Sequence, residues 1–168
     1  ALSRGWKLTP ITKPGCPSTE ARRDSSYSED LCAAWREKAF QWIANNRPDL
    51  VVLANIYPTE SPNSPHLQAS SLDIYRRGIR RTLVRLAQNK VPVILIRDSP
   101  HGDFNVPDCL ARSVRTGLFP RESCRMVASG ALHPEFFEAD QKAAADLPNV
   151  SILDLSSEYC PGKYCDVE

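Results

Sequence analysis

Asp98, Ser99 and His101 are the residues whose types and spacing could do chemistry. They come just after Val91–Ile96, an apolar and largely β-branched run, with only Arg97 between. Such a run is typical of a buried parallel strand. Open α/β sheets bind their ligands just beyond the carboxyl ends of these strands. We therefore predict that Asp98, Ser99 and His101 lie at the edge of a pocket.

Two interpretations of these three residues stay open. Asp98 and His101 could act as an orienting acid and a base, because a carboxylate partner can fix the tautomer of a histidine. Residues three apart on a loop seldom adopt that geometry, however. In the plainer interpretation, Asp98 and Ser99 only cap a loop, and His101 is solvated.

The sequence contains no self-contained catalytic motif. It has neither a Gly-x-Ser-x-Gly elbow nor a glycine-rich loop that could cradle a phosphate. Cys-x-x-Cys couples with histidines at metal-ligand spacing are also missing from the sequence. We therefore predict neither a cofactor nor a metal.

The six cysteines fall into couples that are close in sequence. Sequence proximity selects one of the fifteen pairings that six cysteines permit. The predicted disulfides are Cys16–Cys32, Cys109–Cys124 and Cys160–Cys165. Disulfides form and persist outside the cytosol, so the chain is predicted to be extracytoplasmic.

Length and charge narrow the classes of partner. A chain of 168 residues fits a single domain, 1–168, that can bury a core of its own. The 21 Lys and Arg against 20 Asp and Glu leave a net charge of +1, which gives no electrostatic footprint for nucleic acid or an anionic membrane. We therefore predict no nucleic-acid partner. No apolar run approaches the ~20 residues that cross a bilayer, so we also predict no direct membrane insertion. The lack of a recognisable signal peptide predicts a piece of a longer secreted or membrane-tethered chain.

Apolar periodicity predicts strands and helices that alternate along the chain. The strands are predicted over Trp6–Thr12, Leu50–Ala54, Val91–Ile96 and Val150–Leu155. The helices are predicted over Leu31–Asn46, Leu72–Asn89 and Pro134–Asp146, with a short one around Leu110–Val114. Helical crossovers make such strands parallel, which predicts an α/β fold: a three-layer αβα sandwich around a doubly wound sheet. Sheets of this kind usually have five or more strands, so we expect at least one strand to be missing.

Two groups of side chains have both a functional and a structural interpretation. The arginines at 76, 77, 80, 81 and 85 could bind phosphate or nucleic acid. On an amphipathic crossover helix, however, they would form the solvated side, and this interpretation is favoured. Trp35 and Trp42 share one helical face and could bind sugar, but packing against the sheet is favoured.

Four blocks of the sequence resemble the SGNH-type domain that is fused behind membrane-bound acyltransferase-3 proteins. They are GWKLTPITKPGCP, DLVVLANIY, ILIRDSPHGDFNVPDCL and LDLSSEYCPGKYCD, and together they contain a member of every cysteine couple. The resemblance implies an SGNH-hydrolase-like sandwich with flavodoxin-like strand order that handles acyl esters on bacterial surface glycans. It also implies an acyl donor delivered by a membrane acyltransferase domain, a saccharide acceptor, and tethering to the membrane through the parent chain.

The resemblance also assigns roles to residues. In this family the nucleophilic serine lies in a Gly-Asp-Ser motif on the first strand, and the catalytic Asp and His lie in a late Asp-x-x-His motif. Both blocks are expected outside residues 1–168. Gly15 would offer a backbone N–H to an oxyanion, and Asn55 would offer its side chain. The usual Gly-x-Asn-Asp is replaced by Ala-Asn-Ile-Tyr at 54–57, so an ordinary loop asparagine is the alternative.

The leading hypothesis is that the chain is part of an O-acyltransferase. It would move a short acyl group, such as acetyl, onto a cell-surface saccharide through an SGNH serine site. The competing hypothesis is a non-catalytic extracytoplasmic module that binds glycan or assists another domain, supported by the lack of a complete triad within the 168 residues. On either hypothesis, the 168-residue chain by itself is predicted to be inactive.

Overall fold

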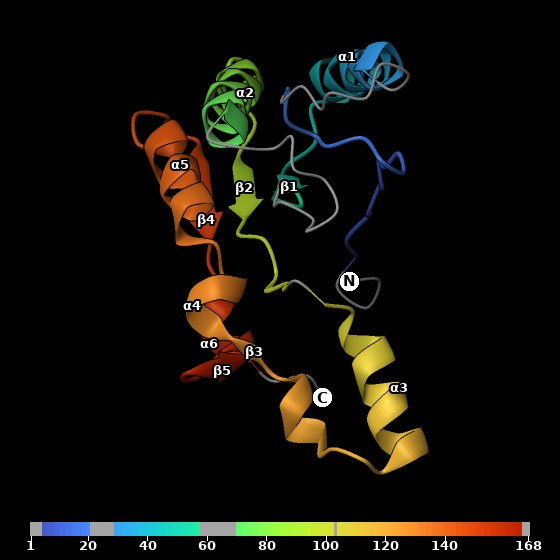
Figure 1. Cartoon of the computed structure of the whole chain (residues 1–168). Helices are drawn as coiled ribbons and strands as arrows, with labels where there is room; N and C mark the ends of the chain where they lie inside the picture. Colours follow the sequence, from blue (N-terminus) through green and yellow to red (C-terminus); the bar gives the residue numbers. More distant parts are fainter. Residues whose placement is uncertain (1–4, 21–28, 58–69, 103, 166–168) are drawn as a thin grey trace.

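The computed structural model describes residues 5–20, 29–57, 70–102 and 104–165 of the chain (Figure 1). These residues form a three-stranded parallel sheet with the strand order β1-β2-β4. The strands are β1 (Val51–Ala54), β2 (Val93–Ile96) and β4 (Val150–Leu153). The long helices are α1 (Glu29–Asn46), α2 (Ser70–Ala87) and α5 (Pro134–Ala144). A parallel sheet with helical crossovers confirms the predicted α/β class.

The core lies on one face of the sheet. Leu53, Val93 and Leu95 are buried there, because alternate residues in register point to the same face. The helices supply the other side of this core at helical spacing, in particular Phe40, Ile43, Tyr75, Ile79, Leu83, Phe136, Ala139 and Ala143. Since α1, α2 and α5 all contribute to this one cluster, they form a single helical layer.

The other face of the sheet is more exposed. Val52 is 54% exposed and Leu153 is also exposed, while Ile94 and Ile96 are half-buried. Parallel sheets are normally covered on both faces, because their strands are apolar on both sides. The second helical layer of the predicted sandwich therefore stays a prediction.

The predicted strand over Trp6–Thr12 is wrong. Residues 6–12 form no strand, and Trp6 and Leu8 are exposed. Alternation of apolar and polar residues indicates which side chains share a face, but a strand also needs a neighbour that completes its backbone hydrogen bonds. In the structure this segment forms no ladder with β1, whose sheet partner is β2.

The segment after β2 is more ordered than its sequence indicates. The short helix expected around Leu110–Val114 is longer, α3 (Val106–Thr116). The Asn105 side chain caps it by accepting the Asp108 N–H at 3.0 Å, and Gly117 ends it with a φ of 62°. Figure 1 shows α3 extending beyond the carboxyl ends of the strands.

Several short elements complete the part of the molecule beyond the carboxyl ends of the strands. They are η2 (Arg121–Cys124), β3 (Met126–Val127), α4 (Ala128–Ala131), α6 (Ser156–Tyr159) and β5 (Tyr164–Cys165). β3 and β5 pair antiparallel, an arrangement that the sequence did not indicate. All three predicted disulfides are confirmed: Cys16–Cys32, Cys109–Cys124 and Cys160–Cys165. They join the N-terminal loop to α1, α3 to η2, and the residue that follows α6 to β5.

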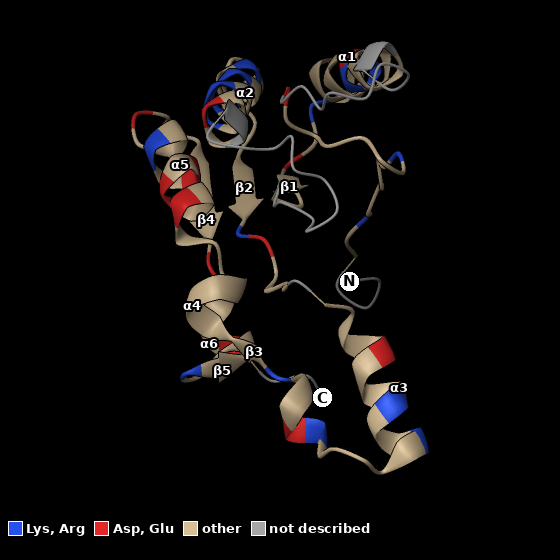
Figure 2. Ribbon diagram, in the orientation of Figure 1, with Lys and Arg blue, Asp and Glu red and all other residues tan. Residues whose placement is uncertain are grey.

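The arginines of α2 lie on its solvent side, as predicted (Figure 2). Four of them form ion pairs at the surface: Arg76–Asp73, Arg80–Asp146, Arg81–Glu20 and Arg85–Glu37. The predicted packing of the tryptophans is confirmed for Trp42, which is half-buried against the core, while Trp35 is half-buried at a cavity between α1 and β1. Among the residues that the structure describes, no helix combines the length and apolarity needed to cross a membrane.

Candidate functional site

The carboxyl edge of the sheet gathers the polar residues that follow β1 and β2. The two strands end in register, with Ala54 opposite Ile96. Residues 55–57 and 97–101 therefore leave the sheet side by side. The structure places Asp98 and His101 here, together with Asn55.

Asp98 links the two strand exits. Its Oδ2 atom accepts the backbone N–H of Tyr57 at 2.7 Å and lies 3.5 Å from Nδ1 of His101. The Asp98 side chain is only 7% exposed. Burial raises the pKa of Asp98, while the Tyr57 N–H, His101, the Ser99 N–H and His133 act in the opposite direction. Asp98 is therefore a buried acceptor between strands rather than a simple loop cap.

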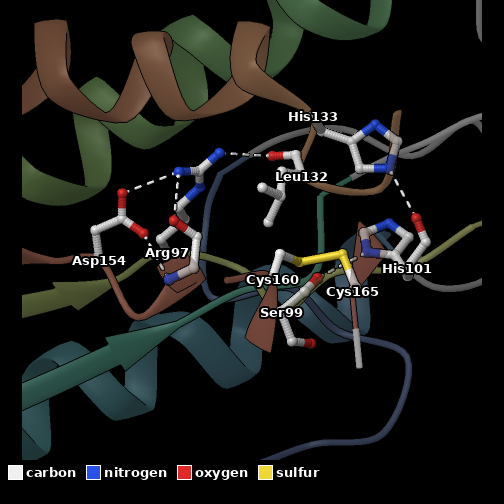
Figure 3. Close-up of a disulfide and its surroundings, with 9 residues drawn as sticks. Arg97, Ser99, His101, Leu132, His133, Asp154, Cys160 and Cys165 are labelled. Carbon is white, nitrogen blue, oxygen red and sulfur yellow. Dashed lines mark hydrogen bonds and ion pairs between the residues drawn. A yellow bond between two sulfur atoms is a disulfide. The ribbon is translucent and has the colours of Figure 1, made fainter. Parts of the chain in front are cut away.

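His101 packs beside a second histidine. Its ring centroid lies 4.6 Å from that of His133, and Nε2 of His133 lies 3.3 Å from the His101 carbonyl oxygen (Figure 3). Nδ1 of His101 is 3.1 Å from the carbonyl oxygen of Ser99, closer than it is to Asp98. The fold thus brings Asp98 and His101 together more closely than their spacing on a loop indicates. Ser99 itself is exposed.

The carboxamide of Asn55 is buried, with the residue 9% exposed. Its Oδ1 atom accepts the backbone N–H of Ser18 at 3.0 Å and is also contacted by the Ser18 hydroxyl. Its Nδ2 atom has no hydrogen-bond partner in the described part of the chain. A buried side-chain donor without a partner is uncommon in a folded protein, and among the described residues only this atom and Nε of Arg97 share the property.

Gly15 lies in a tight turn of the N-terminal loop. The Cys16 N–H donates to the Lys13 carbonyl at 3.1 Å, with Pro14 and Gly15 at the central positions. Gly15 has a φ of +74°, the value that favours glycine at the third position of a type II turn. The same loop carries Ser18 and is tied to α1 through Cys16, so Gly15 and the contact to Asn55 belong to one fixed segment. The oxyanion role of Gly15 stays a prediction.

A buried carboxylate below the edge escaped the sequence reasoning. Asp140 of α5 is 1% exposed, and it accepts the hydroxyls of Tyr57 and Tyr75, each at 2.7 Å. Burial raises the pKa of Asp140 to about 6, and the charge of Asp98 adds to this, while the two hydroxyl hydrogen bonds oppose it. The sequence held one indication that Asp140 is buried: it follows Phe136 by one helical turn and so lies on the buried face of α5.

Arg97 fastens the end of β2 to its surroundings. Its guanidinium donates to Asp154 at 2.9 Å and to the Leu132 carbonyl at 3.0 Å (Figure 3). It also lies 4.1 Å above the ring of Phe137. These contacts join the ends of β2 and β4 to the start of α5, so the role of Arg97 is structural.

The fold and the edge define an open-sheet α/β domain with a polar site at the carboxyl ends of parallel strands. No three His, Cys, Asp or Glu side chains gather as a metal site within the residues that the structure describes. The family model for the SGNH domain (fused to AT3 domains) matches residues 1–168, so the chain belongs to this family. Comparisons with curated proteins and with solved structures find no match.

Proposed function

We propose that the chain is the SGNH portion of an O-acyltransferase that moves a short acyl group, such as acetyl, onto a cell-surface saccharide. The observation that carries the proposal is the buried Nδ2 of Asn55, which has no partner among the described residues. Family membership supports an acyltransferase-associated module. Asp98, Ser99 and His101 form the pocket edge in this proposal.

A donor of this kind suits acyl transfer. Leaving a buried hydrogen-bond donor unpaired costs about 1–3 kcal/mol. An oxyanion that forms only during the reaction would accept this N–H and recover part of that cost in the transition state. Preorganised donors aimed at developing negative charge supply a large share of such catalysis. Asn55 therefore donates to the tetrahedral intermediate, and the backbone N–H of Gly15 is proposed as a second donor.

The surroundings of β1 favour an additional strand that carries the nucleophile. β1 is at the edge of the sheet, and Val52 is 54% exposed. A cavity of about 230 Å³ lies between β1, α1 and the N-terminal segment, lined by apolar side chains that include Leu8, Ile11 and Phe40. A parallel strand added at this edge would end beside Asn55, because neighbouring parallel strands end at the same side of the sheet.

The serine at the end of that strand would attack the acyl carbonyl carbon and pass its proton to a histidine. The oxyanion would then collapse, breaking the bond to the leaving group, which takes the proton from the histidine, and giving an acyl-serine. A saccharide hydroxyl would give its proton to the histidine as it attacks this ester. Collapse of the second tetrahedral intermediate would release the serine, which takes that proton back. The acyl donor would be supplied by the membrane acyltransferase domain. The three disulfides support an extracytoplasmic location for these steps.

Hydrolysis of p-nitrophenyl acetate by the complete extracytoplasmic protein tests the proposal. Asn55→Ala should lower kcat by roughly 10²–10³-fold with little change in KM. The matched control is Asn149→Ala, because Nδ2 of Asn149 donates to the Val91 carbonyl at 2.8 Å near the opposite end of the sheet. Asn149→Ala should affect stability and leave kcat unchanged.

A second variant separates catalysis from binding. Replacing the serine of the Gly-Asp-Ser motif by alanine should abolish turnover. Turnover that survives this change, or an Asn55→Ala variant with unaltered kcat, contradicts the proposal. Saturable glycan binding without any serine-dependent turnover would instead favour the non-catalytic module.

A further inference from the structure

We propose that Ser18 and Asp98 are positioning residues that hold the Asn55 carboxamide in the orientation needed to donate to an oxyanion. The proposal rests on the proposed function of Asn55. Neither residue is taken to touch the substrate in this role. Both act through Asn55, one on its side chain and the other on the backbone that follows it.

Ser18 determines which way the amide of Asn55 faces. The backbone N–H of Ser18 can only donate, so the Asn55 atom that it approaches at 3.0 Å must be the carbonyl oxygen. The Ser18 hydroxyl contacts the same oxygen. A flipped amide would bring its NH₂ group against the N–H of Ser18, which is unfavourable. The NH₂ group of Asn55 is therefore directed away from Ser18.

Asp98 holds the backbone segment on which Asn55 sits. Its Oδ2 atom accepts the Tyr57 N–H at 2.7 Å, three residues past Ala54, where the ladder between β1 and β2 ends. A hydrogen bond from a backbone N–H to a carboxylate is stronger than one to a neutral acceptor. This bond extends the attachment of β1 to β2 across Asn55.

The far side of Tyr57 is also anchored. Its hydroxyl donates to Asp140 at 2.7 Å, and its ring stacks on Phe136 with centroids 5.3 Å apart. Tyr57 is therefore fixed at its backbone N–H, its ring and its hydroxyl. Asn55 contacts Ser18 through its side chain and precedes this fixed tyrosine by two residues in the chain, so both its carboxamide and its backbone are held.

The choice of residue at position 98 points to positioning rather than to stability alone. Burying a carboxylate is costly, and the two backbone N–H groups and two histidines around Asp98 only partly compensate for it, since its pKa is still raised. The benefit of the charge is a short and strongly directed bond to the segment that presents Asn55. We infer that accurate placement of Asn55, to within a few tenths of an ångström, is what this bond provides.

Kinetics of the complete extracytoplasmic protein with p-nitrophenyl acetate test the inference. Asp98→Ala should lower kcat about 10-fold with KM changed less than about twofold. This pattern is expected because the affected hydrogen bond, from Asn55 to the oxyanion, forms only in the transition state. Asp98→Asn should recover only part of kcat, because its amide oxygen can still accept the Tyr57 N–H but lacks the charge that shortens and directs this bond. Ser18→Ala retains the backbone donor and should lower kcat by about threefold.

A double-mutant cycle with Asn55 gives the decisive readout. If Asp98 acts through Asn55, Asp98→Ala should have no further effect on kcat in the Asn55→Ala background. A loss of the same size in both backgrounds overturns the inference, as does an Asp98→Ala variant with unaltered kcat. If Asp98→Ala does not fold, Ser18→Ala carries the same cycle.

Two matched controls report what a purely structural contact does. Asp154→Ala removes a carboxylate at the exit of β4 that accepts Arg97 at 2.9 Å, and Ser113→Ala removes a hydroxyl that donates to the Phe119 carbonyl at 2.9 Å. Both should lower the melting temperature and leave kcat unchanged. If Asn55→Ala itself has no effect on kcat, the proposed function fails. If Asn55→Ala lowers kcat but the cycles are additive, only the positioning inference fails.

Discussion

The buried carboxylate of Asp140 should make the stability of this fold depend on pH. Burial raises the pKa of Asp140 from an ordinary value of 3.8 to about 6. Between these two values the folded protein binds more protons at this site than the unfolded chain does. The free energy of unfolding therefore falls as the pH rises through this window. A difference of about two pKa units, at 1.36 kcal/mol each, corresponds to about 3 kcal/mol of stability over the whole titration, of which about 2 kcal/mol is lost between pH 4 and pH 7.

Asp140→Asn removes this contribution, because the amide has a similar shape and cannot ionise. When the pH is raised from 4 to 7, the stability of Asp140→Asn relative to the wild type should therefore increase by about 2 kcal/mol. The measurement is urea unfolding of both oxidised proteins, followed by tryptophan fluorescence at half-unit steps from pH 4 to pH 7.5. Asp98 has a raised pKa as well, but it is present in both proteins and its contribution largely cancels in the difference.

Tyr75→Phe tests the same reasoning with the opposite sign. The Tyr75 hydroxyl donates to Asp140 at 2.7 Å and lowers the pKa of that carboxyl. Its removal should raise the pKa of Asp140 further, so that stability falls more steeply with pH and over a higher range. Parallel pH profiles for the wild type and Asp140→Asn would refute the argument, because they would show that the Asp140 pKa is the same in both states.

Two further predictions concern the loops. Replacing Cys109 and Cys124 by alanine together should lower the free energy of unfolding by about 3 kcal/mol, the loop-entropy estimate for a sequence separation of 15. Thiol titration of the unreduced wild type should find no free thiol, and a free thiol would contradict the pairing. Gly15→Ala should cost about 1 kcal/mol in urea unfolding, because its φ is +74° although its surroundings leave room for a methyl group. Gly15→Asn should cost less, and an equal or larger loss would contradict the turn geometry.

The regular elements of the core could be predicted from the sequence. Apolar residues repeat at helical spacing in α1, α2 and α5, and short β-branched runs mark β1, β2 and β4. These patterns are local, and burial of one helical face or one strand face is enough to produce them. The disulfides could also be predicted, since each joins cysteines at most 16 residues apart. The placement of Asp98 and Asn55 at one edge follows from the parallel connection of β1 and β2.

The tertiary structure alone decided the contacts that make this edge a candidate site. Ser18 and Asn55 are 37 residues apart, Tyr57 and Asp98 are 41 apart, and Tyr57 and Asp140 are 83 apart. Local periodicity carries no information about such pairs, because each depends on which segments the whole chain packs together. The error at residues 6–12 has the same origin: their alternation is typical of a strand, but only a neighbouring strand could make them one.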